Sequence, residues 1–110
     1  MIHLTHGEDI LKEGVANLQK SVETVGGKLY LTNQRLVFRA HALNVQGGVT
    51  EIPLAQVCKL TKCWTKLFGV IPLYPNSLAI STHDNAVFRF VLFGRDSWRA
   101  AIAERIGTRA

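Results

Sequence analysis

Apolar and polar residues alternate in short segments along most of the chain, which is the pattern of half-buried β-strands. These segments are separated by turn residues, for example at Asn33-Gln34 and from Pro72 to Asn76. Beyond Gly94 the apolar residues recur instead at the spacing of an α-helix. The sequence therefore predicts seven antiparallel strands followed by a single helix.

The first half of the chain contains a predicted β-hairpin with a defined register. A two-residue turn at Asn33-Gln34 places apolar residues opposite apolar residues on one face of this hairpin. On the other face the same register sets two positive charges directly opposite each other. The predicted pairs are Leu29 with Phe38, Leu31 with Leu36, Tyr30 with Val37, and Lys28 with Arg39.

A second hairpin and the helix complete the predicted core. The turn of this hairpin falls at His83-Asp84-Asn85, and alternation places four apolar side chains on its inner face. The helix carries an apolar stripe that must cover an open end of the sheet. The inner residues of the hairpin are Leu78, Ile80, Phe88 and Phe90, and those of the helix are Trp98, Ala101, Ile102 and Ile106.

The stretch from Gly27 to Phe38, GKLYLTNQRLVF, resembles the central hairpin of GRAM domains, a branch of the pleckstrin-homology superfold. Shorter segments follow in that family's order: Ile52-Pro53-Leu54, Ile71-Pro72, Leu78-Ala79-Ile80, Phe88-Arg89-Phe90 and Trp98. The resemblance implies a mainly β fold, a seven-stranded antiparallel, partly open barrel of two bent sheets capped by one C-terminal helix. Residues 1–110 then form one domain with its core at about 10–106, and residues 1–9 are an N-terminal tail.

The composition favours a soluble domain with anionic partners. Thirteen Lys and Arg residues against eight Asp and Glu residues give a formal net charge of +5, which attracts lipid headgroups or other anions. No segment approaches the roughly 20 apolar residues of a membrane span, and the start of the chain lacks the pattern of a secretory signal. We therefore expect a cytoplasmic location, with peripheral attachment at the inner face of a membrane.

The first candidate binding surface is the charged face of the central hairpin. Like charges directly opposite one another destabilise a sheet, so Lys28 and Arg39 require a neutralising group. That group is either an anionic headgroup or acidic peptide, or an acidic side chain of the chain itself, for which Glu23 and Glu51 are the candidates.

Three further residues extend this first surface. Tyr30 and Arg35 lie on the same predicted face as Lys28. The resemblance adds Lys20, because Lys20 and Lys28 match the positions of two phosphoinositide-binding residues in many pleckstrin-homology domains. Tyr30 stands where those domains carry an Arg, which is unfavourable for specific phosphoinositide recognition.

The second candidate surface is an apolar loop flanked by lysines. Lys59, Lys62 and Lys66 surround Trp64 and lead into the loop, and this composition is typical of an element that dips into a membrane. Two alternatives stay open, namely packing of the loop into the core and a contact with an oligomer or partner. The apolar residues concerned are Trp64, Leu67, Phe68, Val70, Ile71, Leu73 and Tyr74.

Signatures of catalysis are missing from the sequence. No glycine-rich loop joins a strand to a helix, and no nucleophile elbow is present. His3 and His6 fall in the expected tail, where metal ligands are not held rigidly. Cys58 and Cys63 are expected to be half-buried, reduced thiols. We therefore predict no enzymatic activity, no cofactor and no metal.

Two classes of function remain after these exclusions. The first is a GRAM-type module that binds anionic membrane lipid. The alternative is a protein-interaction or homo-oligomerising domain that uses an exposed strand edge, the groove between the fifth strand and the final helix, or the apolar loop at residues 67–75. Binding to nucleic acid would rest on charge alone and is not expected.

Overall fold

The structure is a computed structural model that describes residues 2–20, 23–41, 48–67 and 71–106, although the side chains of residues 20, 23, 63–67 and 71–76 lie outside the description. The elements are β1 (Ile10–Lys20), β2 (Glu23–Thr32), β3 (Arg35–Ala40), β4 (Val49–Pro53), the 3-10 turn η1 (Leu54–Gln56), β5 (Val57–Leu67), β6 (Ile71–Thr82), β7 (Val87–Leu92) and α1 (Arg95–Ile106).

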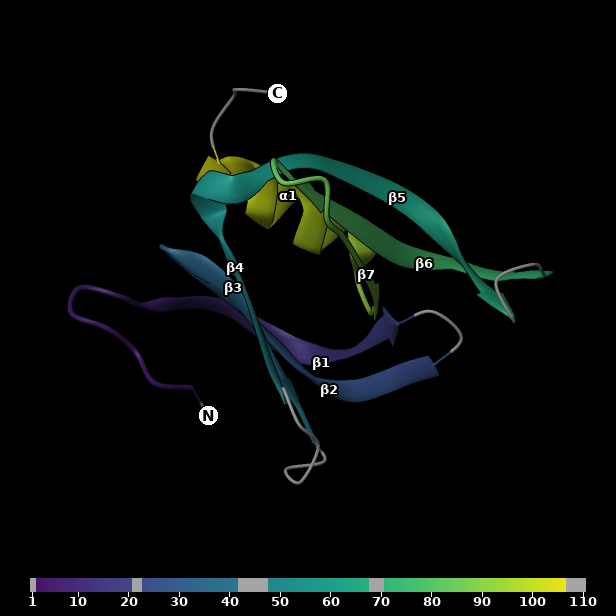
Figure 1. The fold of residues 1–110 in the computed structure, drawn as a ribbon, viewed down its shortest axis with the longest axis horizontal. Helices are drawn as coiled ribbons and strands as arrows, with labels where there is room; N and C mark the ends of the chain where they lie inside the picture. The colour runs from purple at the N-terminus through teal and green to yellow at the C-terminus, as the bar shows by residue number, and fades with distance from the viewer. Residues whose placement is uncertain (1, 21–22, 42–47, 68–70, 107–110) are drawn as a thin grey trace.

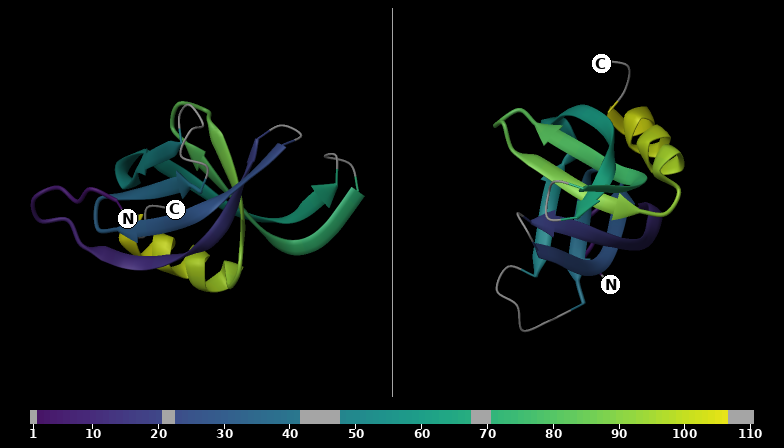
Figure 2. Two further views of the ribbon diagram at one scale, coloured as in Figure 1. Left: turned by 90° about the horizontal axis from the view of Figure 1, so that it is seen from below. Right: turned by 90° about the vertical axis from the view of Figure 1, so that its right-hand side faces the viewer.

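All neighbouring strands pair antiparallel in the order β4-β3-β2-β1-β7-β6-β5. The sheet bends so that β1 to β4 and β5 to β7 form two layers, as Figures 1 and 2 show. Helix α1 contacts β5, β6 and η1 at one end of these layers. The prediction of a seven-stranded, partly open antiparallel fold with one C-terminal helix is confirmed.

The register predicted for the central hairpin is also correct. Leu29 pairs with Phe38 and Leu31 with Leu36, and all four side chains are buried. The opposite wall of the core comes from β6 and β7, where Leu78 pairs with Phe90. The rings of Phe38 and Phe90 meet with centroids 5.6 Å apart and join the two layers.

Helix α1 closes the core through its apolar face. Trp98 and Ile102 are buried, as the helical spacing predicts. The helix begins after Gly94, whose φ of +69° suits glycine, and the backbone N–H of Trp98 donates to the carbonyl of Gly94 at 3.0 Å. Lys12 Nζ lies 5.2 Å from the centroid of the Trp98 ring, and this contact also joins β1 to the helix.

Across the described segments, no helix combines the length and apolarity needed to cross a bilayer.

The N-terminal segment lies against the β2–β3 turn, which differs from the tail expected there. The side chain of Asn33 anchors it twice, since its amide group donates to the Gly7 carbonyl at 3.0 Å and its oxygen accepts from the Asp9 N–H at 3.1 Å. Glu8 is buried at the centre of the contact. Another difference concerns Cys58, expected to be half-buried, which is exposed.

The β5–β6 hairpin continues beyond the rest of the sheet. Its ladder runs from Val57 with Thr82 out to Leu67 with Ile71, whereas β7 pairs with β6 only from Ser77 to Ser81. Residues 64–67 and 71–76 therefore form a two-stranded part with no third strand among the described pairings. We call these residues the hairpin extension. It projects away from the two layers in Figures 1 and 2.

Candidate binding surfaces

Arg35 is the centre of a hydrogen-bonded network on the outer face of β2 and β3. Its Nε donates to Glu8 Oε2 at 2.7 Å, and its Nη2 donates to Glu8 Oε1 at 3.1 Å and to the His3 carbonyl at 2.5 Å. The hydroxyl of Thr32 donates to Glu8 Oε2 at 2.6 Å. Glu51 Oε1 lies 3.1 Å from Arg35 Nη1. The guanidinium of Arg35 is therefore held by groups of the chain itself.

This network changes the ionisation of its two charged members. The hydrogen bonds from Arg35 lower the pKa of Glu8 to about 2, with further help from Thr32, and outweigh the opposing effect of burial. The same contact raises the pKa of Arg35. Both groups are thus charged at neutral pH, and they form a structural ion pair.

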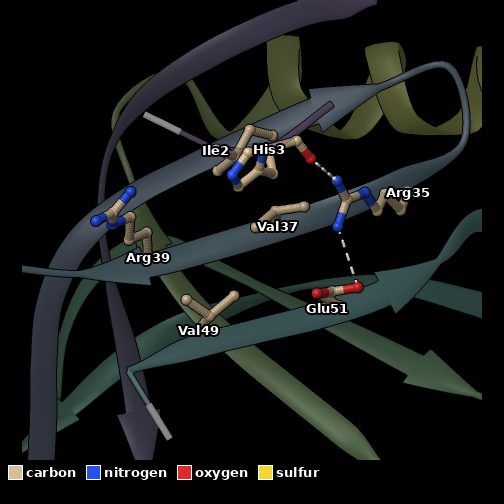
Figure 3. Close-up of a pocket in the computed structure, with 7 residues that line it drawn as sticks. All are labelled: Ile2, His3, Arg35, Val37, Arg39, Val49 and Glu51. Atoms are coloured by element: carbon tan, nitrogen blue, oxygen red, sulfur yellow. Dashed lines mark hydrogen bonds and ion pairs between the residues drawn. The ribbon is translucent and has the colours of Figure 1, made fainter. Parts of the chain in front are cut away.

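An open hollow of about 730 Å³ lies beside this network, on the outer face of β3 and β4 (Figure 3). Val37 forms its floor and the N-terminal segment forms one wall. The cations that line it are Arg35 and Arg39. The lining residues are Ile2, His3, Arg35, Val37, Arg39, Val49 and Glu51.

The opposition of Lys28 and Arg39 occurs as predicted, but the neutralising group was not foreseen. Glu13 on β1 lies 3.1 Å from Lys28 Nζ, and this contact is the main cause of a raised pKa of Lys28. Lys28 Nζ also lies 5.7 Å from the centroid of the Tyr30 ring. Tyr30 itself is buried, so it is not available as a surface contact.

The lysines of β5 differ in their surroundings. Lys59 is exposed. Lys62 Nζ lies 3.0 Å from the Asp96 carboxylate on α1 and lowers the pKa of Asp96. This ion pair links β5 to α1 at the place where a peptide groove was expected. The hollow that the structure describes beside α1 instead faces β1 and measures about 370 Å³. Its lining residues are Leu11, Lys12, Leu31, Ala101, Glu104 and Arg105.

The remaining candidate residues lie where side chains are not described. Lys20 ends β1 and pairs with Glu23 in the ladder. Lys66, Trp64, Leu67, Ile71, Leu73 and Tyr74 belong to the hairpin extension by their backbone, and Phe68 and Val70 fall outside the described residues altogether. The backbone of the described residues among these, other than Lys20, thus lies along the one β5–β6 hairpin. In the portion of the chain that is described, no group of three His, Cys, Asp or Glu side chains could hold a metal ion.

The match to a family covers nearly the whole chain. The sequence model of the GRAM domain matches residues 1–106. The chain belongs to the GRAM family. No curated protein matches it significantly. GRAM and pleckstrin-homology-like domains commonly mediate lipid or protein binding and are typically not catalytic.

Solved structures agree on the fold of this GRAM domain. It superposes on the C-terminal domain of an unknown protein from Leishmania infantum with a TM-score of 0.75 at 17% identity, covering 91% of this chain and 85% of that one. The superposition on the Vps36 N-terminal PH domain has a TM-score of 0.70 at 16% identity, and it covers 94% of this chain and 83% of that one. The superposition on the DH/PH domains of p115-RhoGEF has a TM-score of 0.69 at 12% identity, and it covers 94% of this chain and 32% of that one. At such identities the likeness concerns the fold alone.

Three residues of this GRAM domain were not singled out from the sequence. Glu8 has no local signal, because its burial depends on an arginine far along the chain. Glu13 could be foreseen only after the β1–β2 register was known. Phe93, which is 86% exposed, did have a signal: alternation from the inward-facing Phe88 and Phe90 places position 93 on the outer face.

Proposed function

We propose that this GRAM domain is a non-enzymatic module that attaches peripherally to anionic membrane lipid, at the inner face of a membrane, through the hairpin extension. The observation that carries the proposal is the extension itself. Beyond Ser77 the hairpin has only two strands in the described pairings. An isolated two-stranded hairpin is marginally stable in water, so an apolar one favours a covering surface.

The sequence of the extension supports lipid as that surface. It combines Trp64 and Tyr74, residue types enriched at membrane interfaces, with apolar residues at its tip. Lysines precede the tip, and each Lys near an anionic surface contributes about 1 kcal/mol. The net charge of +5 adds a long-range attraction of the same sign.

A vesicle assay with matched variants tests the proposal. The wild-type domain should sediment with vesicles of phosphatidylserine and phosphatidylcholine, not with phosphatidylcholine alone, and binding should fall as ionic strength rises. Phe68→Ser combined with Ile71→Ser should abolish binding with an unchanged melting temperature. Val87→Ser is the control, because Val87 is an apolar residue that is 56% exposed and lies outside the hairpin extension. A lower melting temperature of the double variant would instead indicate packing of the tip into the core.

The lysines of β5 allow a second, independent comparison. Lys59 is exposed, whereas Lys62 is paired with Asp96. Lys59→Ala should weaken binding to the anionic vesicles about fivefold. Lys62→Ala removes the same formal charge but also frees a carboxylate, so its loss of binding should be at least as large. If both variants bound the anionic vesicles as tightly as the wild type, the lysines of β5 would not belong to the lipid contact.

The alternative function is an interaction with protein, and the open sheet favours it. In the described pairings β4 and β5 each have one edge without a partner strand, and such edges can accept an extended peptide or a second copy of the chain. Pairing through an edge depends little on ionic strength, in contrast to binding of anionic vesicles. A solution mass that falls when Phe68 and Ile71 are replaced by Ser would identify an oligomer contact.

A further inference from the structure

We infer that Phe93, together with Val15 and Lys28, forms a second membrane contact of this domain, separate from the hairpin extension. The inference rests on the proposed attachment to anionic lipid. Its starting point is the exposure of Phe93, which at 86% is the highest among the large apolar side chains that the structure describes. Because the favourable free energy of burial grows with the apolar area that leaves the water, Phe93 would gain the most among these side chains from a covering surface.

The strand register gives Phe93 its neighbours. Leu92 pairs with Ala16, and both are buried. Phe93 directly follows the last residue of β7, and Val15 precedes Ala16 on β1, so each lies one residue from this pair. Alternation from the two buried residues places both on the outer face. Val15 is itself 58% exposed. Two strongly exposed apolar side chains therefore lie close to the same Ala16–Leu92 pair.

The same transverse row continues into the cations of the central hairpin. Val15 pairs with Lys28 on β2, and Lys28 pairs with Arg39 on β3. The side chain of Lys28 is 44% exposed. Because strands are about 4.8 Å apart, the two apolar residues and the two cations follow one another within about 15 Å. Apolar side chains next to cations match the interface of an anionic bilayer, where the former enter the acyl boundary and the latter meet phosphates.

Two observations favour lipid over a protein as the occupant. Neither of the two hollows described above is lined by Phe93 or Val15. Apolar side chains that protrude from a surface suit a fluid bilayer, because a bilayer needs no complementary shape. The row also borders the hairpin extension. Val91 pairs with Ser77, the residue of β6 that adjoins the extension, and Phe93 follows two residues after Val91.

Binding to vesicles of phosphatidylserine and phosphatidylcholine tests the inference. Phe93→Ser should lower the partition coefficient about tenfold, because a buried aromatic ring contributes that much to transfer, and Phe93→Leu should recover most of it. Val87→Ser is the control with an exposed apolar residue outside the row. If the wild type binds the vesicles and Phe93→Ser binds them equally well, this inference alone is overturned, and the outer face would serve another partner. No binding of the wild type would overturn the proposed function as well.

Fluorescence gives a test that does not depend on affinity. Trp98 is buried, so in Trp64→Phe combined with Phe93→Trp the introduced tryptophan is the only exposed one. Brominated phospholipid in the anionic vesicles should quench its emission and shift it to the blue. The single variant Trp64→Phe measures the background of Trp98. If brominated lipid leaves the emission of the double variant unchanged, position 93 stays in water when the domain is bound.

Discussion

Glu8 and Arg35 form a two-point ion pair across the N-terminal segment and the β2–β3 hairpin, with contacts of 2.7 and 3.1 Å. The Glu8 side chain has no accessible surface, while that of Arg35 is 17% exposed. A carboxylate removed from water is tolerated only when its oxygens are fully hydrogen-bonded. Arg35, Thr32 and the backbone N–H of Thr5 meet this condition. The pair therefore fixes the N-terminal segment on the sheet.

Removal of the Glu8 carboxylate should destabilise the fold. Glu8→Ala leaves the half-buried guanidinium of Arg35 with Glu51 as its remaining carboxylate partner, and we expect the free energy of unfolding in urea to fall by about 2–4 kcal/mol. Glu13→Ala is the matched control, because it breaks the exposed ion pair with Lys28 and should cost less than about 1 kcal/mol. If the free energy of unfolding fell equally in the two variants, the buried ion pair would contribute no more to stability than the exposed one.

The stability contributed by Glu8 should depend on pH in a defined window. The pKa of Glu8 is about 2 in the folded protein against 4.5 as the ordinary value. A group whose pKa is depressed by folding stabilises the protein above its unfolded pKa, and this contribution is lost as the pH falls through the folded pKa. The depression corresponds to about 3 kcal/mol. The wild type should therefore lose stability between about pH 5 and pH 2, and Glu8→Gln should lose less over that range.

The two inner-face glycines of the N-terminal sheet should respond differently to alanine. A Cβ at Gly27 would stand 2.3 Å from the carbonyl oxygen of Arg39, which belongs to the paired backbone of β3. Gly27→Ala should therefore separate β2 from β3 and cost about 3 kcal/mol or more. A Cβ at Gly14 would stand 3.6 Å from the Trp98 ring, an ordinary contact. Gly14→Ala should change thermal stability little, and a large loss there would contradict the packing of Trp98.

The central hairpin shows how far the sequence alone determines this fold. Alternation and a two-residue turn suffice to pair Leu29 with Phe38 and to set Lys28 opposite Arg39, because both depend on neighbours in sequence. The same local argument extends to the apolar stripe of Trp98 and Ile102. The resemblance to the family supplied the overall form, a bent and partly open seven-stranded barrel, whereas the order of the strands came only from the structure.

The contacts that the sequence did not predict all join distant segments. Glu13 neutralises Lys28 only because β1 and β2 pair in one particular register. The pairing of Lys62 with Asp96 depends on where α1 docks. No periodic pattern encodes either pair, since a single charge has many partners of opposite sign in the chain. Long-range electrostatics thus follow from the fold and could be assigned only after it was known.

The ion pair of Glu13 and Lys28 leads to a last prediction about lipid binding. If Lys28 belongs to the membrane contact, Glu13 competes with lipid phosphate for the same ammonium group. Glu13→Gln should then strengthen binding to phosphatidylserine vesicles by about fivefold, the effect of one charge near the surface. Glu104→Gln changes the net charge of the domain equally but lies on α1 and is exposed. Flotation of both variants at low ionic strength checks this expectation, and an equal gain in both would assign the effect to net charge and not to the row of Phe93, Val15 and Lys28.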